Sequence, residues 1–200
     1  MTLTKSDLRA EILAARRSAS QQTRQHEAAA LARHLGALAA PGGTVCAYVP
    51  VGSEPGTIAM IDALVSGKVT VLLPVAREDP DGTPRPLEWG RYTPGELVAA
   101  PFGLREPPPP RLPADAVHDA SMIVIPALAV DRGGARLGRG AGYYDRTLPR
   151  ADPAALLIAV IRDDELVEHL PSEPHDVPMT HALTPRRGLV ALGGGLATGG

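Results

Sequence analysis

The spacing of apolar residues predicts two helices in the first 40 residues of the chain. Residues 4–7 have the spacing of a capping box, and apolar side chains then recur at helical intervals as far as about Arg17. Ser20 is placed to cap a second helix, which Pro41 and the two glycines after it end. The expected buried faces are Leu8, Ile12 and Ala15 in the first helix and Ala28, Leu31, Ala32, Leu35 and Leu38 in the second.

Beyond residue 43, short apolar runs predict buried strands. The runs cover residues 44–49, 69–75, 122–130 and 155–161. The first two are connected by a turn at residues 50–56 and by a helical stretch with an apolar face at Ile58, Ile61, Leu64 and Val65, which predicts a parallel pair with a right-handed crossover. A glycine-rich loop and a short helix between the last two runs repeat that unit. We therefore expect an α/β protein with a three-layer, Rossmann-like architecture, in which helices cover both faces of an open, mostly parallel sheet and a site lies at the carboxyl ends of the strands.

The remaining segments are predicted to connect or follow these elements. Asp81-Gly82 indicates a turn, residues 86–89 are compatible with an edge strand, and residues 107–110 form a polyproline spacer unsuited to helix or sheet. The glycine-rich end of the chain has no apolar pattern to bury. The expected organisation is a single domain over residues 1–190 and a disordered tail over residues 191–200.

Composition limits the kind of protein that this chain can be. Among 200 residues, 20 Lys and Arg stand against 22 Asp and Glu, so the net charge of −2 gives no general attraction to nucleic acids or anionic membranes. The single cysteine, Cys46, is expected in the core, excludes an intrachain disulfide and suits a reducing compartment. No run approaches the ~18 apolar residues of a membrane span, and the start lacks an apolar signal core. We expect a cytoplasmic protein without a membrane, nucleic-acid or obligate protein partner.

Positive charge is concentrated in one part of the chain. Residues 132–150 contain five Arg and one Asp, whereas residues 151–200 contain three basic and seven acidic residues. A local field of this kind fits a small anion bound at one loop better than a long polyanion lying across the surface.

Residues 131–146, directly after an apolar run, have the features of an anion-binding loop. Gly138, Gly140 and Gly142 alternate, so that backbone N–H groups can turn inward and approach a ligand closely. A helix predicted to begin near Gly142 adds its N-terminal donors, and Arg136 and Arg139 supply counter-charge. Backbone donors and positive charges of this kind are the groups that bind a nucleotide phosphate.

The loop matches neither of two common phosphate-binding signatures. The chain has no Gly-x-x-x-x-Gly-Lys-[Ser/Thr] sequence, and Tyr143 stands where a dinucleotide fingerprint requires a small residue. A surface turn with solvated arginines is the plain alternative. Asp145 argues against that alternative, because a carboxylate beside a phosphate site repels the ligand unless a cation such as Mg²⁺ lies between them.

Residues 136–145, Arg-Leu-Gly-Arg-Gly-Ala-Gly-Tyr-Tyr-Asp, closely resemble the signature of the 5-formyltetrahydrofolate cyclo-ligase family, whose members are also called methenyltetrahydrofolate synthetases. The resemblance extends over nearly the whole chain, and its weaker parts are Lys5-x-x-x-Arg9 and residues 48–57, 103–107 and 173–176. It implies an ATP- and Mg²⁺-dependent conversion of 5-formyltetrahydrofolate to 5,10-methenyltetrahydrofolate, with release of ADP and phosphate. The formyl oxygen attacks the γ-phosphate, N10 closes on the activated carbon, and phosphate leaves. Arginines, backbone amides and a metal serve such a transfer without a side-chain nucleophile.

The resemblance also implies roles for individual residues. The expected ATP contacts are Lys5, Arg9, Arg136, Leu137, Gly138, Arg139, Gly140, Ala141, Gly142, Tyr143 and Tyr144. The expected folate contacts are Val49, Glu54, Arg139, Gly140, Ala141, Gly142 and Tyr143, and the expected catalytic groups are Arg136, Arg139 and Tyr143. Asp145 and Asp176 are the expected Mg²⁺ ligands. The chain departs from the family pattern at Ala141, where some relatives have Lys, and at Thr180, where many have an acidic residue.

Several residues and the whole chain also have alternative interpretations. Without the resemblance, Lys5 and Arg9 are a solvated helix face, and Glu54 and Asp176 are ordinary turn carboxylates. A sugar-phosphate isomerase or a CoA-transferase-like enzyme would use the same arginines to bind a substrate phosphate. The basic helices of residues 5–33, with a net charge of +3, could belong to a nucleic-acid-binding module, although no aromatic residues interleave with their charges.

Overall fold

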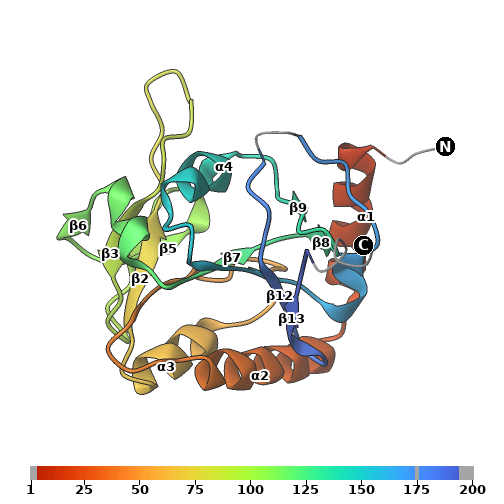
Figure 1. Ribbon diagram of the computed structural model, residues 1–200, viewed down its shortest axis with the longest axis horizontal. Helices are drawn as coiled ribbons and strands as arrows, with labels where there is room; N and C mark the ends of the chain where they lie inside the picture. Colours follow the sequence, from red (N-terminus) through yellow and green to blue (C-terminus); the bar gives the residue numbers. More distant parts are fainter. Residues whose placement is uncertain (1–3, 174–175, 194–200) are drawn as a thin grey trace, which may run out of the picture.

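An eight-stranded sheet forms the centre of the computed structural model, which describes residues 4–173 and 176–193 (Figure 1). From one edge to the other, its strands are β13 (Gly188–Ala191), β12 (His181–Thr184), β10 (Leu156–Val160), β7 (Met122–Pro126), β1 (Thr44–Cys46), β2 (Thr70–Val75), β3 (Glu88–Arg91) and β6 (Arg111–Leu112). The five strands from β12 to β2 are parallel, whereas β13, β3 and β6 each pair antiparallel with their neighbours. The predicted α/β fold with an open, mostly parallel sheet is therefore confirmed.

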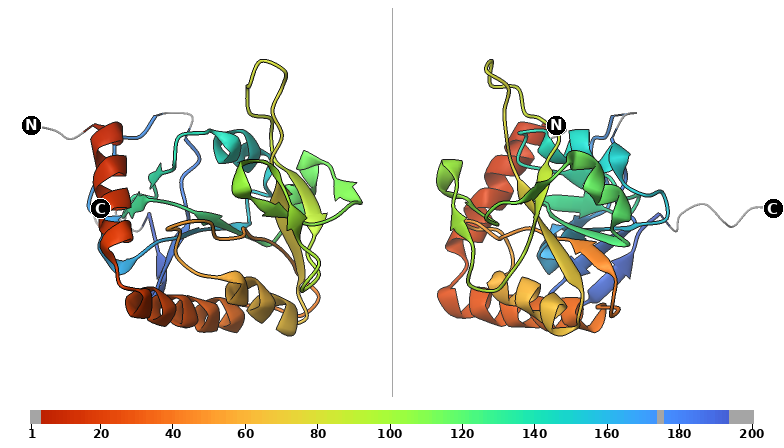
Figure 2. Two further views of the ribbon diagram at one scale, coloured as in Figure 1. Left: turned by 180° about the vertical axis from the view of Figure 1, so that it is seen from behind. Right: turned by 90° about the vertical axis from the view of Figure 1, so that its left-hand side faces the viewer.

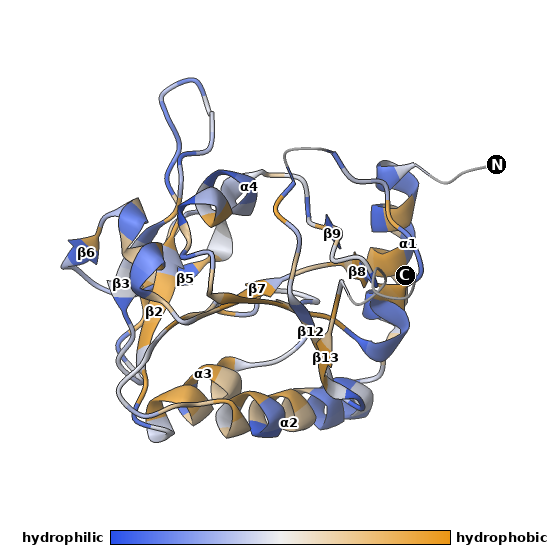
Figure 3. Cartoon of the chain, in the orientation of Figure 1, coloured by the Kyte–Doolittle hydropathy of each residue, from blue (hydrophilic) through white to orange (hydrophobic). Residues whose placement is uncertain are grey.

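Helical segments cover both faces of this sheet. The long helix α2 (Gln21–Ala37) and α3 (Ile58–Ser66) lie along one face, and η2 (Ala114–Asp119), α4 (Tyr143–Thr147) and η3 (Leu148–Arg150) pack on the other (Figures 1 and 2). Successive strand residues point to opposite faces, so Val71 and Leu73 belong to one core and Leu72 to the other. Figure 3 shows apolar residues gathered on the central strands. Because both faces are covered, the central strands β7 and β10 are apolar throughout and do not alternate with polar residues.

The first helix, α1 (Lys5–Ser18), packs on a small second sheet beside the central one. That sheet consists of β11 (Leu166–Val167), β8 (Ala129–Asp131) and β9 (Arg136–Leu137). The predicted capping box is confirmed, since Thr4 and Asp7 each accept a backbone hydrogen bond from the other. Ala15 is exposed and was wrongly expected in the buried face, whose apolar members are the partly buried Leu8, Ile12 and Leu13 and whose fully buried member is Arg16. The shift in face follows from the partner of α1, which is the small sheet and not α2.

The second helix agrees with its prediction, and other elements differ in detail. The Ser20 side chain caps α2, and the predicted face of α2 packs in the core with α3. Ile58, expected on the buried face of α3, is 37% exposed at the first position of that helix, and Met60 is buried instead. The run of residues 122–130 divides into β7 and β8, because Pro126 has no N–H to continue the ladder and the chain crosses to the second sheet there. The run of residues 44–49 is a strand only to Cys46, which is buried as expected.

Next to β2, the expected edge strand is wrong, whereas the expected turn at Asp81-Gly82 is confirmed. Residues 86–89 were expected to contain an edge strand, but β3 pairs with β2 on one side and β6 on the other. Asp81-Gly82 does form a turn, with Gly82 at φ +82° and the Asp79 N–H donating to the Thr83 carbonyl at 2.8 Å. This turn is the tip of a hydrophilic segment that protrudes above α4 (Figure 3). Two short strands, β4 (Val98–Ala99) and β5 (Arg105–Glu106), and the single turns η1 (Pro101–Gly103) and η4 (Asp163–Glu165) complete the elements.

The expected tail and the expected polyproline spacer can both be compared with the structure. The last strand includes Ala191 and so reaches one residue into the segment that was expected to form a tail. Residues 194–200 lie outside the described residues. Residues 107–110 contain neither helix nor strand, as expected for the polyproline spacer. No helix in the described part of the chain has both the length and the apolar character needed to cross a membrane.

Candidate active site

A cavity of about 300 Å³ opens at the carboxyl ends of β1, β2 and β7. The chain leaves β1 for β2 on one side and later returns to β7 on the other side of β1. In open α/β sheets, this reversal of strand order leaves a crevice above the strand ends, and ligands bind there. Tyr48 and Val49 after β1, Ala76 after β2 and Ala127 after β7 all line the cavity. The cavity therefore lies where the sequence predicted a site, at the carboxyl ends of the strands.

Every residue that the sequence indicated as a site residue lines this one cavity. Lys5 and Arg9 come from α1, and Asp176 comes from the segment before β12. The others come from the turn after β1 and from β9, α4 and the glycine loop between them. The set is Lys5, Arg9, Val49, Glu54, Arg136, Leu137, Gly138, Arg139, Gly140, Ala141, Gly142, Tyr143, Tyr144, Asp145 and Asp176. Convergence of residues from four distant parts of the chain disfavours the interpretation of Lys5 and Arg9 as an ordinary solvated face. Their individual roles stay predictions.

The glycine loop has a backbone conformation that favours glycine at two of its three glycine positions. Gly140 has φ +102° and Gly142 has φ +83°, values that L side chains rarely adopt. Gly142 immediately precedes α4, which begins where the sequence predicted it. Arg9 Nε donates to the Gly138 carbonyl at 2.9 Å, which fixes α1 against the loop. The loop therefore presents its backbone to the cavity from a defined position.

Arg136 in β9 and Asp145 in α4, on either side of this loop in the chain, form an ion pair. Arg136 Nη2 donates to Asp145 Oδ1 at 2.7 Å, and the guanidinium lies 5.8 Å from the ring centre of Tyr144. The Arg136 side chain is 9% exposed, whereas that of Asp145 is half exposed. Burial raises the pKa of the Tyr144 phenol, so this ring is neutral at physiological pH. Arg136 is thus oriented by two neighbours before any ligand arrives.

Glu54 places a carboxylate inside the cavity. Its side chain is 8% exposed, accepts a hydrogen bond of 3.0 Å from the Val51 N–H, and lies 3.7 Å from Arg139 Nε. Burial raises the pKa of Glu54, and the Val51 hydrogen bond and the charges of Arg139 and Arg16 oppose that rise. The turn that carries Glu54 is held by Tyr48, whose hydroxyl donates to the Pro55 carbonyl at 2.9 Å. The alternative of an exposed turn carboxylate is therefore wrong.

Sequence reasoning missed a buried ion pair beneath the cavity. Arg16 donates from Nε and Nη2 to the two carboxylate oxygens of Glu165 at 2.6 and 2.7 Å, and Nη2 also reaches the Ala127 carbonyl at 2.6 Å. Its Nη1 is buried and has no hydrogen-bond partner among the described residues, and Arg16 lines the cavity. No signal in the sequence distinguishes Arg16 from Arg17 beside it, because the partner carboxylate is 149 residues away.

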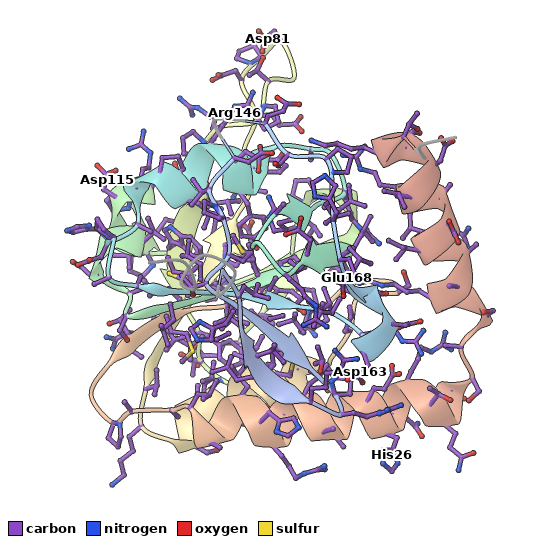
Figure 4. All side chains as sticks on the ribbon, turned by 45° about the vertical axis from the view of Figure 1, so that its right-hand side comes forward. His26, Asp81, Asp115, Arg146, Asp163 and Glu168 are labelled. Atoms are coloured by element: carbon purple, nitrogen blue, oxygen red, sulfur yellow. The ribbon has the colours of Figure 1, made fainter. Side chains whose placement is uncertain are left out.

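The protruding segment contacts the glycine loop through Tyr143. The Tyr143 hydroxyl donates to Glu78 Oε1 at 2.9 Å, and both burial and this hydrogen bond raise the pKa of Tyr143. Thr147 in α4 accepts from the Leu87 N–H at 2.9 Å and so ties the other end of the segment to the same helix. In Figure 4, Asp81 marks the tip of the segment and Arg146 lies beneath it on α4. The segment is therefore anchored at the rim of the cavity.

The predicted Mg²⁺ ligands, Asp145 and Asp176, both line the cavity. Asp145 lies in α4, and Asp176 accepts the Glu173 N–H at 2.8 Å in the segment before β12, where Glu173 is 3.7 Å from Lys5 Nζ. Within residues 4–173 and 176–193, no three His, Cys, Asp or Glu side chains are grouped closely enough to hold a metal on their own. Two carboxylates fit a Mg²⁺ ion that arrives with phosphate oxygens and water, because Mg²⁺ rarely uses an all-protein cage. Thr180 is not among the residues that line the cavity, and its hydroxyl is hydrogen-bonded to the backbone of Leu157 in β10.

A cavity at the reversal point of a parallel sheet, lined by arginines and a glycine loop, is the ligand site typical of the α/β class of enzymes. The chain matches the model of the 5-formyltetrahydrofolate cyclo-ligase family over residues 1–185 and belongs to that family. The resemblance found in the sequence is thereby confirmed.

Individual relatives agree with the family assignment. A 5-formyltetrahydrofolate cyclo-ligase of Mycolicibacterium smegmatis is 62% identical over 188 residues, which are 94% of this chain and 97% of that protein. The enzyme of the same name from Escherichia coli strain K12 is 30% identical over 150 residues, covering 72% of this chain and 79% of its own. The solution structure of the Aquifex aeolicus 5,10-methenyltetrahydrofolate synthetase covers 99% of this chain and 97% of its own, with a TM-score of 0.73 and 26% identity. These matches favour a cyclo-ligase over the isomerase, transferase and nucleic-acid-binding alternatives.

Proposed function

We propose that this protein uses ATP and Mg²⁺ to close 5-formyltetrahydrofolate into 5,10-methenyltetrahydrofolate. The formyl oxygen attacks the γ-phosphate and ADP departs. N10 then attacks the phosphorylated formyl carbon and loses its proton, and inorganic phosphate leaves with the former formyl oxygen. The observation that carries the proposal is the convergence of all the residues marked by the family signature on one cavity.

The glycine loop and four cationic side chains supply what phosphoryl transfer requires. Such reactions need little covalent help from the protein, and positioning with charge stabilisation accounts for most of the rate. Arg136 and Arg139 offer planar guanidinium groups at the loop, and Lys5 and Arg9 approach from α1. Because Arg136 is already oriented by Asp145 and Tyr144, the free-energy cost of reorganising its side chain on binding a phosphate is small.

The folate ring is assigned to the deeper part of the cavity. Its aminopyrimidinone carries N–H donors and a carbonyl acceptor on one edge. The Glu54 carboxylate is an acceptor for the donors, and the buried Nη1 of Arg16 is a donor that lacks a partner in the described chain. Buried polar groups are costly when unpaired, so a ligand that satisfies both of them binds with directional preference.

Asp145 and Asp176 are the groups assigned to Mg²⁺. When bound there, the ion neutralises phosphate charge that the two carboxylates would otherwise repel. Asp145 also holds Arg136 at 2.7 Å. The same carboxylate therefore serves the cation site and the orientation of the arginine.

The test of this proposal is direct turnover. The purified protein is mixed with 5-formyltetrahydrofolate, ATP and Mg²⁺, and the near-ultraviolet absorbance of the methenyl product is followed. We expect product only when both ATP and Mg²⁺ are present. Equal product formation without nucleotide contradicts the proposal.

A further inference from the structure

Among the described residues that line the cavity, Arg16 is the only cation that is fully buried. Its Nε and Nη2 lie on one edge of the planar guanidinium and donate to the two oxygens of Glu165 at 2.6 and 2.7 Å. Nη1 lies outside that edge and is directed away from Glu165. This nitrogen is buried and has no hydrogen-bond partner in the described chain. A buried donor without a partner is costly, and a ligand that brings an acceptor to this point removes the cost.

The protein holds Arg16 in place before any ligand binds. Nη2 also donates to the carbonyl of Ala127, directly after β7, at 2.6 Å. Glu165 is held in turn by the Arg162 N–H, which donates to Glu165 Oε2 at 2.7 Å. Glu165 is not among the described residues that line the cavity, so it acts on a ligand only through Arg16. Arg16 is therefore a preorganised donor, and Glu165 is its positioning residue.

Glu54 supplies acceptors in the same region of the cavity. The charge of Arg16 opposes the rise in the pKa of Glu54 that burial causes, so the two side chains are within electrostatic range of each other. Both charges also act on the pKa of the buried Tyr48, in opposite directions. Tyr48 and Ala127 come after β1 and β7, which are neighbouring parallel strands. The inner end of the cavity, beside Tyr48 and Ala127, thus presents two carboxylate oxygens and one guanidinium nitrogen to a ligand.

We propose that Arg16 makes this site selective for 4-oxo pteridines and excludes their 4-amino analogues. The inference rests on the proposed function, because it concerns the ring of the same substrate. The edge of a 2-amino-4-oxo ring presents, in order, the donor of the 2-amino group, the donor at N3 and the acceptor of the 4-oxo group. Glu54 accepts from the two donors, and Nη1 of Arg16 donates to the 4-oxo oxygen.

A 4-amino analogue reverses two of these three positions. Its N3 has lost the proton and is an acceptor, and its 4-amino group is a donor that faces the donor-only guanidinium of Arg16. Glu54 can adapt by taking up a proton, because burial already raises its pKa. Arg16 cannot adapt, since a guanidinium stays charged at every pH that a folded protein tolerates. A site whose buried polar groups are left unpaired rejects such an analogue, so Arg16 is the residue that enforces the selection.

The experiment measures Kd by calorimetry, without nucleotide, for 5-formyltetrahydrofolate and for its 4-amino analogue, which keeps the N5 formyl group and N10. We expect the wild type to bind the analogue roughly a hundredfold more weakly. In Arg16→Lys, the single nitrogen is engaged by Glu165 and gives no planar second donor, so this ratio falls to roughly tenfold or less. The double variant Arg16→Gln/Glu165→Gln leaves no buried charge unpaired and is expected to show the same fall. Arg17→Gln, an exposed neighbour outside the cavity, is the matched control and keeps the wild-type ratio.

The positioning role of Glu165 has its own variant. Glu165→Asp keeps both charges but draws the guanidinium back by about one carbon–carbon bond, so a ratio between those of the wild type and Arg16→Lys is expected. Thermal melting reports on folding, and each ratio compares two ligands on one protein, so a partly unfolded fraction cancels.

The outcomes separate this inference from the proposed function. Equal binding of the two ligands by the wild type, or the wild-type ratio retained in Arg16→Lys and the double variant, overturns the selection by Arg16 while turnover still stands. The expected ratios without any turnover support the selection and overturn the proposed reaction. Failure of the wild type to bind either ligand overturns both.

Discussion

Arg9 and Gly138, 129 residues apart in the chain, are joined by a hydrogen bond of 2.9 Å between the guanidinium Nε and the carbonyl oxygen. This contact fixes the first helix to the glycine loop. Both parts of the proposed phosphate site therefore keep one relative position, so the cost of ordering them is met on folding and not on ATP binding.

We predict that Arg9→Lys weakens ATP binding although the charge is kept. Lysine cannot place a donor at Nε and also direct a charge into the cavity, so the loop loses its fixed position. A single hydrogen bond of ordinary strength corresponds to a two- to tenfold rise in KM for ATP, roughly. Arg17→Lys, on the same face of α1 but outside the cavity, is the control and keeps the wild-type KM for ATP. Equal values for the two variants would show that the contact with Gly138 is irrelevant to ATP.

Arg136→Lys and Arg139→Lys are predicted to lower turnover roughly ten- to a hundredfold each, because lysine cannot reproduce a planar, two-donor grip on phosphate oxygens. Thermal melting controls for folding and is expected to change little for Arg139, whose side chain is 47% exposed. Wild-type ATP affinity by calorimetry and wild-type turnover in both variants would mean that the arginines are solvated turn residues.

Asp145→Asn is predicted to raise the Mg²⁺ concentration needed for half-maximal turnover and to lower the maximum. The amide keeps the shape of the side chain but loses the charge that attracts a hard cation and that orients Arg136. Because the Asp145 side chain is half exposed, we expect a loss of less than about 1 kcal/mol in the free energy of unfolding. The measurement is a Mg²⁺ titration of turnover, and superimposable curves for variant and wild type refute a metal role for Asp145.

Glu54→Gln is predicted to weaken folate binding and to stabilise the fold at neutral pH. Burial raises the pKa of Glu54 above its ordinary value of 4.5, so folding disfavours the charged form of this side chain. The folded wild type therefore binds the proton more tightly than the unfolded chain, and its stability falls as pH rises through the folded-state pKa. Glutamine avoids this penalty, whereas its carboxamide is a weaker acceptor for the folate N–H groups.

The pH dependence gives the check on this prediction. Thermal melts across the acid range are expected to show equal stability of the Glu54→Gln variant and wild type below pH 4.5, and higher stability of the variant at neutral pH. KM for 5-formyltetrahydrofolate is expected to rise roughly ten- to a hundredfold. A variant that is less stable at neutral pH and keeps its folate KM would place Glu54 in a purely structural role.

The predictable part of this protein was local in the sequence. The capping box at Thr4, the crossover from β1 to β2, and the loop of Gly138, Gly140 and Gly142 all follow from spacing and residue type over a few positions. The family signature then added residues from distant segments. Each of these signals is complete within a short stretch of chain, so no tertiary information was needed to find it.

The missed part depends on contacts between distant segments. Arg16 pairs with Glu165, and Tyr143 with Glu78, across intervals that no pattern in the chain links. Ala15 was misplaced for a similar reason. The helical period predicts an apolar face, but the sheet that packs against α1 determines which residues of that face are buried. The division of residues 122–130 into two strands of different sheets is likewise set by where the chain turns after Pro126.

The central claim is that the formyl oxygen is phosphorylated directly in this cavity. It is tested most directly with 5-formyltetrahydrofolate labelled in the formyl group with the heavy oxygen isotope, followed by mass analysis of the released inorganic phosphate. We predict that each phosphate carries the label, with one ADP formed for each methenyl product. Label released into water, with unlabelled phosphate or no ADP, would contradict the account.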